Sequence, residues 1–239
     1  MASSRELSAN KEQHKPKNVR SKSYDKEIYH AMLKCIDYLE NRFPNLLEHY
    51  KFEHEKSISF AELIKISKAS EFRREYDETF IKNTIKPDGG VVYLVKKDDT
   101  RAKKILVVSE VKIQGTNDQR AKEGKPRQAQ GNAIERLGKN LIGIRTALNH
   151  EKITPFVCFG QGYDFVEDYD ENSFVMSKVS MLNEFYFLNR IYVFKQDGNE
   201  TKNSFAPVSM YFREEEWTSD EMFDVLKEVA ETALRYYIY

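Results

Sequence analysis

The chain has 239 residues, of which 40% are hydrophobic and 32% are charged, and its formal net charge at pH 7 is zero. This length suits one α/β unit with insertions, and the hydrophobic content is enough for a real core. Zero net charge argues against a uniformly basic nucleic-acid binder. The sequence has no apolar run of about 18 residues, which excludes a transmembrane helix. It also shows no secretory signal pattern, so we expect a cytoplasmic protein with no membrane partner.

Basic residues gather in two segments although the whole chain is neutral. Residues 1–22 are polar and rich in lysine, and we predict a flexible basic N-terminal arm ahead of a single domain over 23–239. Residues 101–127 are also rich in Lys and Arg, although either segment alone is compatible with an ordinary solvated face. Cys35 and Cys158 lie in apolar surroundings, and we predict reduced core thiols.

The first half of the chain predicts two helices and then two strands. A helix is predicted from Lys26 to about Phe43, because apolar positions keep helical spacing and the following proline disfavours a helical residue before it. A second helical segment is predicted over 59–76. Strands follow at 91–95 and 104–112, and the polar loop between them predicts a hairpin. The run "ILVV" is too continuously apolar for a half-exposed strand, which indicates a central strand buried on both faces.

The second half continues the alternation of helices and strands. A helix is predicted over 132–149, because its apolar positions form one stripe: Ile134, Leu137, Leu141, Ile144 and Leu148. The remaining predicted elements are a strand over 154–160, β structure near 191–194 and 208–212, and a final helix over 219–237. Interleaved strands and helices indicate the α/β class, with a mixed central β-sheet flanked by helices.

The stretch "TIKPDGGVVYLV" places one acid, Asp88, between a proline and a glycine pair at the start of an apolar strand. Asp is disfavoured in strands and suits turns, so ordinary strand punctuation is one interpretation. Further on, "SEVK" puts Glu110 and Lys112 on one face at the end of a buried strand, where an unpaired charge is costly. If the two strands pair with position sums near 199, Asp88 falls opposite residues 110–112. A bulge at Gly89-Gly90 could adjust that register.

Two carboxylates and one ammonium are therefore predicted to converge at one end of the sheet. Close carboxylates repel each other unless a cation joins them. Mg²⁺ commonly takes one or two carboxylates, waters and phosphate oxygens, and it can stabilise a phosphoryl transition state. Asp88 and Glu110 are thus candidate metal ligands, with Lys112 orienting the attacking water. The alternative is a structural salt bridge of Lys112 with either acid, and the spacing alone leaves both open.

These residues resemble a known signature. Pro87-Asp88 followed by Glu110-x-Lys112 resembles the PD-(D/E)xK nucleases. "IKPDGGVV", "VVSEVKIQG" and "GNAIERLGKN" together resemble the EcoRI-type restriction endonucleases. Weaker similarity continues through "PFVCF", "LNR" and "EWTSDEMFDV", whereas residues 160–210 match poorly. The resemblance implies a restriction-endonuclease-like core in a single endonuclease domain. It also implies a homodimeric, Mg²⁺-dependent enzyme of the bacterial cytoplasm, with Asp88 and Glu110 as metal ligands and Lys112 as the catalytic lysine.

The resemblance also implies positions that bind DNA. These are Gln114 beside the site, the recognition segment with Asn132, Ala133, Glu135 and Arg136, and Arg190 in "LNR". On a helical wheel, Asn132, Arg136, Lys139 and Asn140 lie opposite the apolar stripe, which adds Lys139 to the DNA-binding candidates. Asn can read adenine and Arg can read purine acceptors in the major groove. Without the resemblance, an ordinary solvated amphipathic face would be the preferred interpretation.

The matching segment in the family goes with an AATT centre, so the resemblance implies cleavage of GAATTC, or of CAATTG as the second choice. It implies products with 5′-phosphates, and a cognate DNA methyltransferase in the host that protects its DNA without forming a stable complex. Two alternatives stay open. One is a structure-specific repair or junction nuclease of the same superfamily, and the other is a non-catalytic DNA-binding protein.

Overall fold

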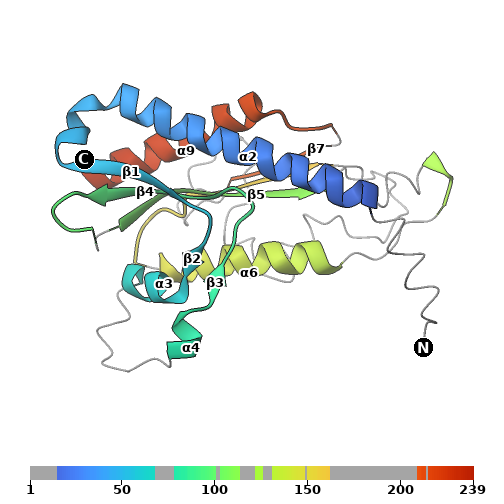
Figure 1. The fold of residues 1–239 in the computed structure, drawn as a ribbon, viewed down its shortest axis with the longest axis horizontal. Helices are drawn as coiled ribbons and strands as arrows, with labels where there is room; N and C mark the ends of the chain where they lie inside the picture. Colours follow the sequence, from blue (N-terminus) through green and yellow to red (C-terminus); the bar gives the residue numbers. More distant parts are fainter. Residues whose placement is uncertain are drawn as a thin grey trace.

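The computed structural model describes residues 15–67, 78–100, 103–113, 122–125, 131–148, 150–161, 209–213 and 215–239. Helices cover both faces of a central sheet, with α2 and α9 on one face and α6 on the other (Figure 1). Within the described residues this sheet has five strands in the order β1-β4-β5-β6-β7. The pairs β1–β4 and β4–β5 are antiparallel, and β5–β6 and β6–β7 are parallel. The predicted α/β class with a mixed central sheet is confirmed.

The elements in chain order are α2 (Lys15–Arg42), the 3-10 helix η1 (Pro44–Glu48), β1 (Tyr50–Glu55), β2 (Ile58–Ser59), α3 (Phe60–Ile66), α4 (Glu78–Ile81), β3 (Thr84–Ile85), β4 (Gly90–Lys96), β5 (Lys103–Ile113), α6 (Gly131–Ala147), β6 (Phe156–Gln161), β7 (Ser209–Arg213) and α9 (Ser219–Ile238). The short strands β2 and β3 pair with each other in a separate two-stranded sheet. None of the helices in the described part of the chain is long and apolar enough to cross a membrane.

Most predicted elements are present, with shifted ends. The first helix begins at Lys15 rather than Lys26, so it includes part of the segment predicted as an arm. The second predicted helix is helical over Phe60–Ile66, and residues 68–76 of that prediction lie outside the described residues, as does the β structure predicted near 191–194. The final helix begins where predicted, because Thr218 and Glu221 form a capping box at its N-terminus.

The hairpin between β4 and β5 is confirmed, but its irregularity lies at a different place from the one predicted. Val95 pairs with Lys103, and the register shifts between Val92 and Tyr93 rather than at the glycine pair. The extra residue on β5 makes Leu106 and Val107 pack on the same face of the sheet, in the cluster with α2 and α9. A regular strand would have alternated faces at this point. The bulge therefore directs Glu110 and Lys112, farther along β5, towards α6.

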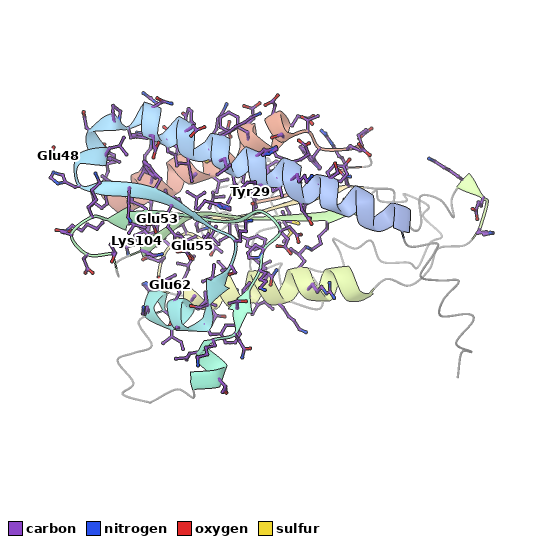
Figure 2. All side chains as sticks on the ribbon, in the orientation of Figure 1. Tyr29, Glu48, Glu53, Glu55, Glu62 and Lys104 are labelled. Atoms are coloured by element: carbon purple, nitrogen blue, oxygen red, sulfur yellow. The ribbon has the colours of Figure 1, made fainter. Side chains whose placement is uncertain are left out.

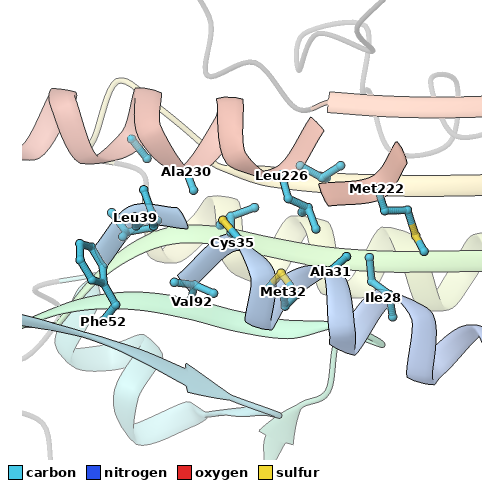
Figure 3. Packing of buried hydrophobic residues seen from close by; sticks show 14 of the residues in the cluster. Ile28, Ala31, Met32, Cys35, Leu39, Phe52, Val92, Met222, Leu226 and Ala230 are labelled. Carbon is cyan, nitrogen blue, oxygen red and sulfur yellow. The ribbon is translucent and has the colours of Figure 1, made fainter. Parts of the chain in front are cut away.

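Two hydrophobic cores enclose the sheet. The first packs α2 and α9 against β1, β4 and β5, with Ile28, Met32, Cys35 and Leu39 from α2 facing Met222, Leu226 and Ala230 from α9 (Figure 3). The second packs the apolar stripe of α6 against the opposite face. The buried strands β4 and β5 are thus held from both sides.

Both cysteines are free and buried, which confirms core thiols, and burial raises the pKa of Cys35 to about 12.

The sequence did not predict strand β1, which lies at the edge of the sheet. Its charged residues make it look like a polar connecting segment. Charges are common on edge strands because they discourage pairing with other chains. Glu53 and Glu55 project from β1 (Figure 2), and both form ion pairs with Lys103 of β5 across the intervening strand β4. These pairs fix the end of the hairpin that lies away from Asp88.

Candidate active site

A tight turn places Asp88 just before the first residue of β4. The amide of Gly90 donates a hydrogen bond of 3.0 Å to the carbonyl oxygen of Pro87, which closes the turn, and Gly89 N donates to the carbonyl of Ser109 at 3.1 Å. Gly90 has φ +78°, a conformation that L side chains rarely adopt. The glycine pair thus allows the turn to close directly against β5, with Asp88 at its tip.

Hydrogen bonds run in both directions between the turn at Asp88 and the end of β5 at Glu110 and Val111. Asp88 N donates to Glu110 Oε2 at 3.1 Å, and the amide of Val111 donates to Asp88 Oδ2 at 3.2 Å. Each carboxylate is therefore held by an amide from the other segment. Although the two acids are far apart in sequence, their side chains lie together at one end of the sheet.

The ammonium of Lys112 lies between the two carboxylates. Its Nζ lies 2.5 Å from Glu110 Oε1, 2.7 Å from Asp88 Oδ2 and 3.2 Å from the carbonyl oxygen of Val111. These three contacts use all three donors of the ammonium group. The predicted convergence of two acids and one lysine is present in the structure.

Burial dominates the electrostatics of this cluster. Glu110 is 1% exposed, and burial, supported by the nearby Asp88, raises its pKa to about 7 against the opposing effect of Lys112. Burial alone would lower the pKa of Lys112, but the charges of Glu110 and Asp88 outweigh it and raise the pKa above its ordinary value. Asp25 on α2 also has a raised pKa, first from burial and then from the charge of Asp88. Glu110 is thus buried, Lys112 is half-buried and Asp88 is exposed beside them, and the acids of the site outnumber its lysine.

His54 of β1 supports the turn from the side away from β5. Its Nε2 lies 2.7 Å from the carbonyl oxygen of Gly89, so this ring nitrogen donates when protonated. The ring of Tyr29 packs edge-on against His54, with 5.2 Å between ring centroids. Sequence reasoning missed His54 because the strand that carries it was not predicted.

Asn140 of α6 also reaches the site. Its Nδ2 donates to Glu110 Oε1 at 3.1 Å. The prediction placed Asn140 on the solvent side of the helix, opposite the apolar stripe, and this is wrong because the side chain is half-buried and faces β5. The spacing contained the signal: Asn140 follows Leu137 by three residues and precedes Ile144 by four, so it lies at the edge of the stripe. Arg136 is exposed, as predicted.

The other predicted DNA-binding residues are less fully described. Lys139 is exposed on α6. Gln114 and Arg190 lie outside the described residues. Asn132, Ala133 and Glu135 belong to the first turns of α6, but their side chains are also outside the described part.

The donor set fits a hard divalent cation. The oxygens of Asp88, Glu110 and Val111 already surround one positive charge, the ammonium of Lys112. No group of three or more His, Cys, Asp or Glu residues that could hold a metal occurs among the described residues. Mg²⁺ does not require one, because it commonly binds one or two carboxylates and completes its shell with water and substrate oxygens.

Comparison with known proteins agrees with this geometry. The family model "Restriction endonuclease EcoRI" matches residues 15–238. The type II restriction enzyme RsrI of Cereibacter sphaeroides is 29% identical, with 64% of each chain covered. The type II restriction enzyme EcoRI of Escherichia coli is 26% identical, with 82% of this chain and 79% of the relative covered. The chain thus spans somewhat under two thirds of RsrI and about four fifths of EcoRI. By the extent of the family match, this chain belongs to the EcoRI restriction endonuclease family.

Proposed function

We propose that this protein is a type II restriction endonuclease that hydrolyses phosphodiester bonds at a palindromic site in double-stranded DNA. Membership in the family implies a double-stranded DNA substrate and, generally, a divalent metal ion. The observation that carries the proposal is the convergence of Asp88, Glu110 and Lys112 at one end of the sheet. Binding alone does not require two acids beside a lysine where phosphates approach, so the cluster favours catalysis.

Asp88 and Glu110, together with the carbonyl oxygen of Val111, would hold the metal ion, which we propose to be Mg²⁺. Such an ion lowers the pKa of bound water and stabilises the charge that develops on the transferred phosphoryl group. The chain itself contributes a preformed arrangement of oxygens, because backbone amides fix both carboxylates. Preorganised groups of this kind need no rearrangement when charge develops.

Lys112 is proposed to act on the scissile phosphate through its positive charge, next to the two carboxylates that would hold the metal. In hydrolysis, water forms a new bond to phosphorus and the bond from phosphorus to the 3′ oxygen breaks. The phosphate stays on the 5′ oxygen of the next nucleotide, and the 3′ oxygen leaves and takes up a proton. All three donors of Lys112 are engaged with Asp88, Glu110 and Val111, so Lys112 must release at least one to bind the phosphate or orient the water. Fragment ends should therefore carry 5′-phosphates and 3′-hydroxyls.

Sequence reading is assigned to the N-terminal half of α6. Arg136 and Lys139 are exposed there, and the segment "GNAIER" contains both Asn132 and Arg136. Asn suits adenine and Arg suits guanine or other purine acceptors. We propose an AATT centre, with GAATTC as the full site and CAATTG as the second choice. The proposed enzyme acts as a homodimer, whose two-fold symmetry on duplex DNA implies a palindromic site, and a cognate methyltransferase would protect host DNA in the bacterial cytoplasm.

Cleavage of a sequenced plasmid with and without Mg²⁺ tests this function. Discrete fragments that require Mg²⁺, with ends mapping to one palindrome centred on AATT, are expected. Smears or cutting confined to junctions would indicate a structure-specific nuclease, and no cutting at any metal concentration would indicate a DNA-binding protein. Glu110→Gln, which keeps the side-chain shape, should abolish cutting while DNA binding remains.

A further inference from the structure

We propose that Asn140 is a positioning residue for Glu110, so that the helix assigned to sequence reading also orients a metal-binding carboxylate. This inference rests on the proposed function. Asn140 touches none of the reacting atoms itself in this assignment. It acts through the orientation of the Glu110 carboxylate, which would bind the metal ion.

Three hydrogen bonds hold the carboxylate of Glu110. Oε2 accepts the amide of Asp88, and Oε1 accepts both Lys112 Nζ and Asn140 Nδ2, at 2.5 and 3.1 Å. Lys112 must change its contacts when substrate or metal arrives, because its donors are all engaged. The bond from Asn140 can persist, since it approaches Oε1 from α6 rather than from β5. Hydrogen bonds to a ligating carboxylate fix its orientation and raise metal affinity.

The packing of α6 fixes the position of Asn140 on the sheet. A Cβ atom at Gly143 would lie only 2.6 Å from Ile85 Cδ1, so the absence of a side chain lets α6 lie close against β3. Ile85 precedes Asp88 by three residues. Leu141 and Ile144 on the same helix are completely buried. The helix therefore contacts both segments that supply carboxylates, and its rotation about its own axis is fixed beside Asn140.

The same continuous helix extends to the proposed recognition residues. Asn132 precedes Asn140 by eight positions, which is about 12 Å of helix at 1.5 Å per residue. No break occurs between them, because α6 runs from Gly131 to Ala147. The end assigned to the bases and the amide that orients Glu110 are thus parts of one rigid element.

Binding of Mn²⁺ in the absence of DNA, followed by electron paramagnetic resonance, tests the inference without cleavage. Asn140→Leu, which keeps the size and removes the donor, is expected to weaken Mn²⁺ binding about tenfold or more. Asn140→Gln, which keeps an amide donor, should recover much of the affinity. Thr146→Ala, an exposed position later on α6, is the matched control and should bind as the wild type does.

DNA binding in the presence of a chelator separates this role from a DNA contact. Asn140→Leu should bind an oligonucleotide as tightly as the wild type, whereas Arg136→Ala should lose DNA affinity and keep Mn²⁺ affinity. Wild-type Mn²⁺ affinity in Asn140→Leu, or loss of DNA affinity alone, would overturn the inference and leave the proposed function standing. A wild-type protein that neither binds Mn²⁺ nor cuts DNA would overturn the proposed function itself. If circular dichroism shows Asn140→Leu to be unfolded, Asn140→Ala is measured in the same way.

Discussion

The ammonium nitrogen of Lys112 lies 2.5 Å from Oε1 of Glu110, two residues earlier on the same strand. It also bonds Asp88, so one positive charge lies between two acids and reduces their mutual repulsion. The oxygens that stabilise this ammonium are those that would hold a metal ion. Lys112 and the proposed metal ion would therefore compete for the same contacts before substrate binds.

Replacement of Lys112 by Met should abolish cleavage and yet tighten metal binding in the absence of DNA. A unit charge about 4 Å away is worth roughly 4 kcal/mol at an effective dielectric constant near 20. Even about a third of that energy would tighten metal binding about tenfold, so a gain of at least this size is expected. Calorimetric titration with Mg²⁺ measures it. Lys104→Met, which removes a lysine of β5 paired with Glu151 outside the site, is the control. Weaker binding by Lys112→Met would contradict the competition.

The same variant should fold less stably without metal. Breaking a buried ion pair by removing one partner typically costs about 3–5 kcal/mol, because the remaining charge stays buried. The free energy of unfolding, measured with urea at pH 7, should fall in Lys112→Met and recover when Mg²⁺ is added. An unchanged denaturation midpoint would show that the pair contributes nothing to folding.

Metal affinity should rise with pH up to about pH 7. Burial raises the pKa of Glu110 to about 7 from its ordinary value of 4.5, so the folded protein holds a proton in this range that the unfolded chain has released. The contribution of Glu110 to stability is therefore present below pH 4.5 and decreases as the pH rises to about 7. A metal binds the ionised carboxylate, so binding at pH 6 should release a proton and binding at pH 8 should not.

Calorimetry in two buffers of different ionisation enthalpy detects that proton. Glu110→Gln should bind metal weakly and show no dependence on the buffer. Equal metal affinity at pH 6 and pH 8 in the wild type would contradict a raised pKa at this position.

The turn that carries Asp88 should be intolerant of a side chain at Gly90. Both Gly90 and Gly124 have positive φ, but a Cβ at Gly90 would lie 2.4 Å from the carbonyl oxygen of Glu55, whereas a Cβ at Gly124 would meet no atom of the described residues within 4 Å. Gly124→Ala should cost about 1–2 kcal/mol of unfolding free energy, the cost of the left-handed conformation. Gly90→Ala should cost clearly more and should lower cleavage. Equal losses of stability in the two variants would show that β1 moves easily to make room for the added methyl group.

Substitution of Arg136 by Ala should reduce discrimination between the proposed site and sites with one altered base pair. A lost bidentate base contact costs about 1–3 kcal/mol, whereas non-specific binding should change less. Competition binding with GAATTC and single-base variants measures it. Arg235→Ala is the control, because Arg235 lies on α9, on the other side of the sheet (Figure 1). Equal loss of affinity for every sequence would make Arg136 a phosphate contact.

The sequence predicted the cluster of Asp88, Glu110 and Lys112 because the apolar runs of β4 and β5 are long and the loop between them is short. It could not predict the bulge, since Leu106 and Val107 are as apolar as their neighbours and only packing decides which residue is extra. The face that Glu110 takes depends on that bulge. A correct pairing of strands was therefore not sufficient to place the carboxylate.

The supporting residues were harder to predict because their partners are distant in sequence. His54 contacts the carbonyl of Gly89, and Asn140 contacts Glu110, so each role exists only once β1 or α6 is docked on the sheet. Asn140 was assigned to solvent because a polar residue at the margin of an apolar stripe resembles any other surface residue. Local patterns identify elements, whereas these roles depend on contacts between elements.

Because α6 turns by about 100° with each residue, the number of residues between Asn132 and Asn140 sets the angle between their side chains about the helix axis as well as their distance along it. Inserting or deleting one residue there would turn the amide of Asn140 away from Glu110 or rotate the first turn away from the bases that it is proposed to read, even if every side chain were kept. Divergence of the DNA site within this family should therefore proceed by exchange of residues in that segment. Insertions or deletions in the segment between Asn132 and Asn140 are expected only where they add or remove whole helical turns.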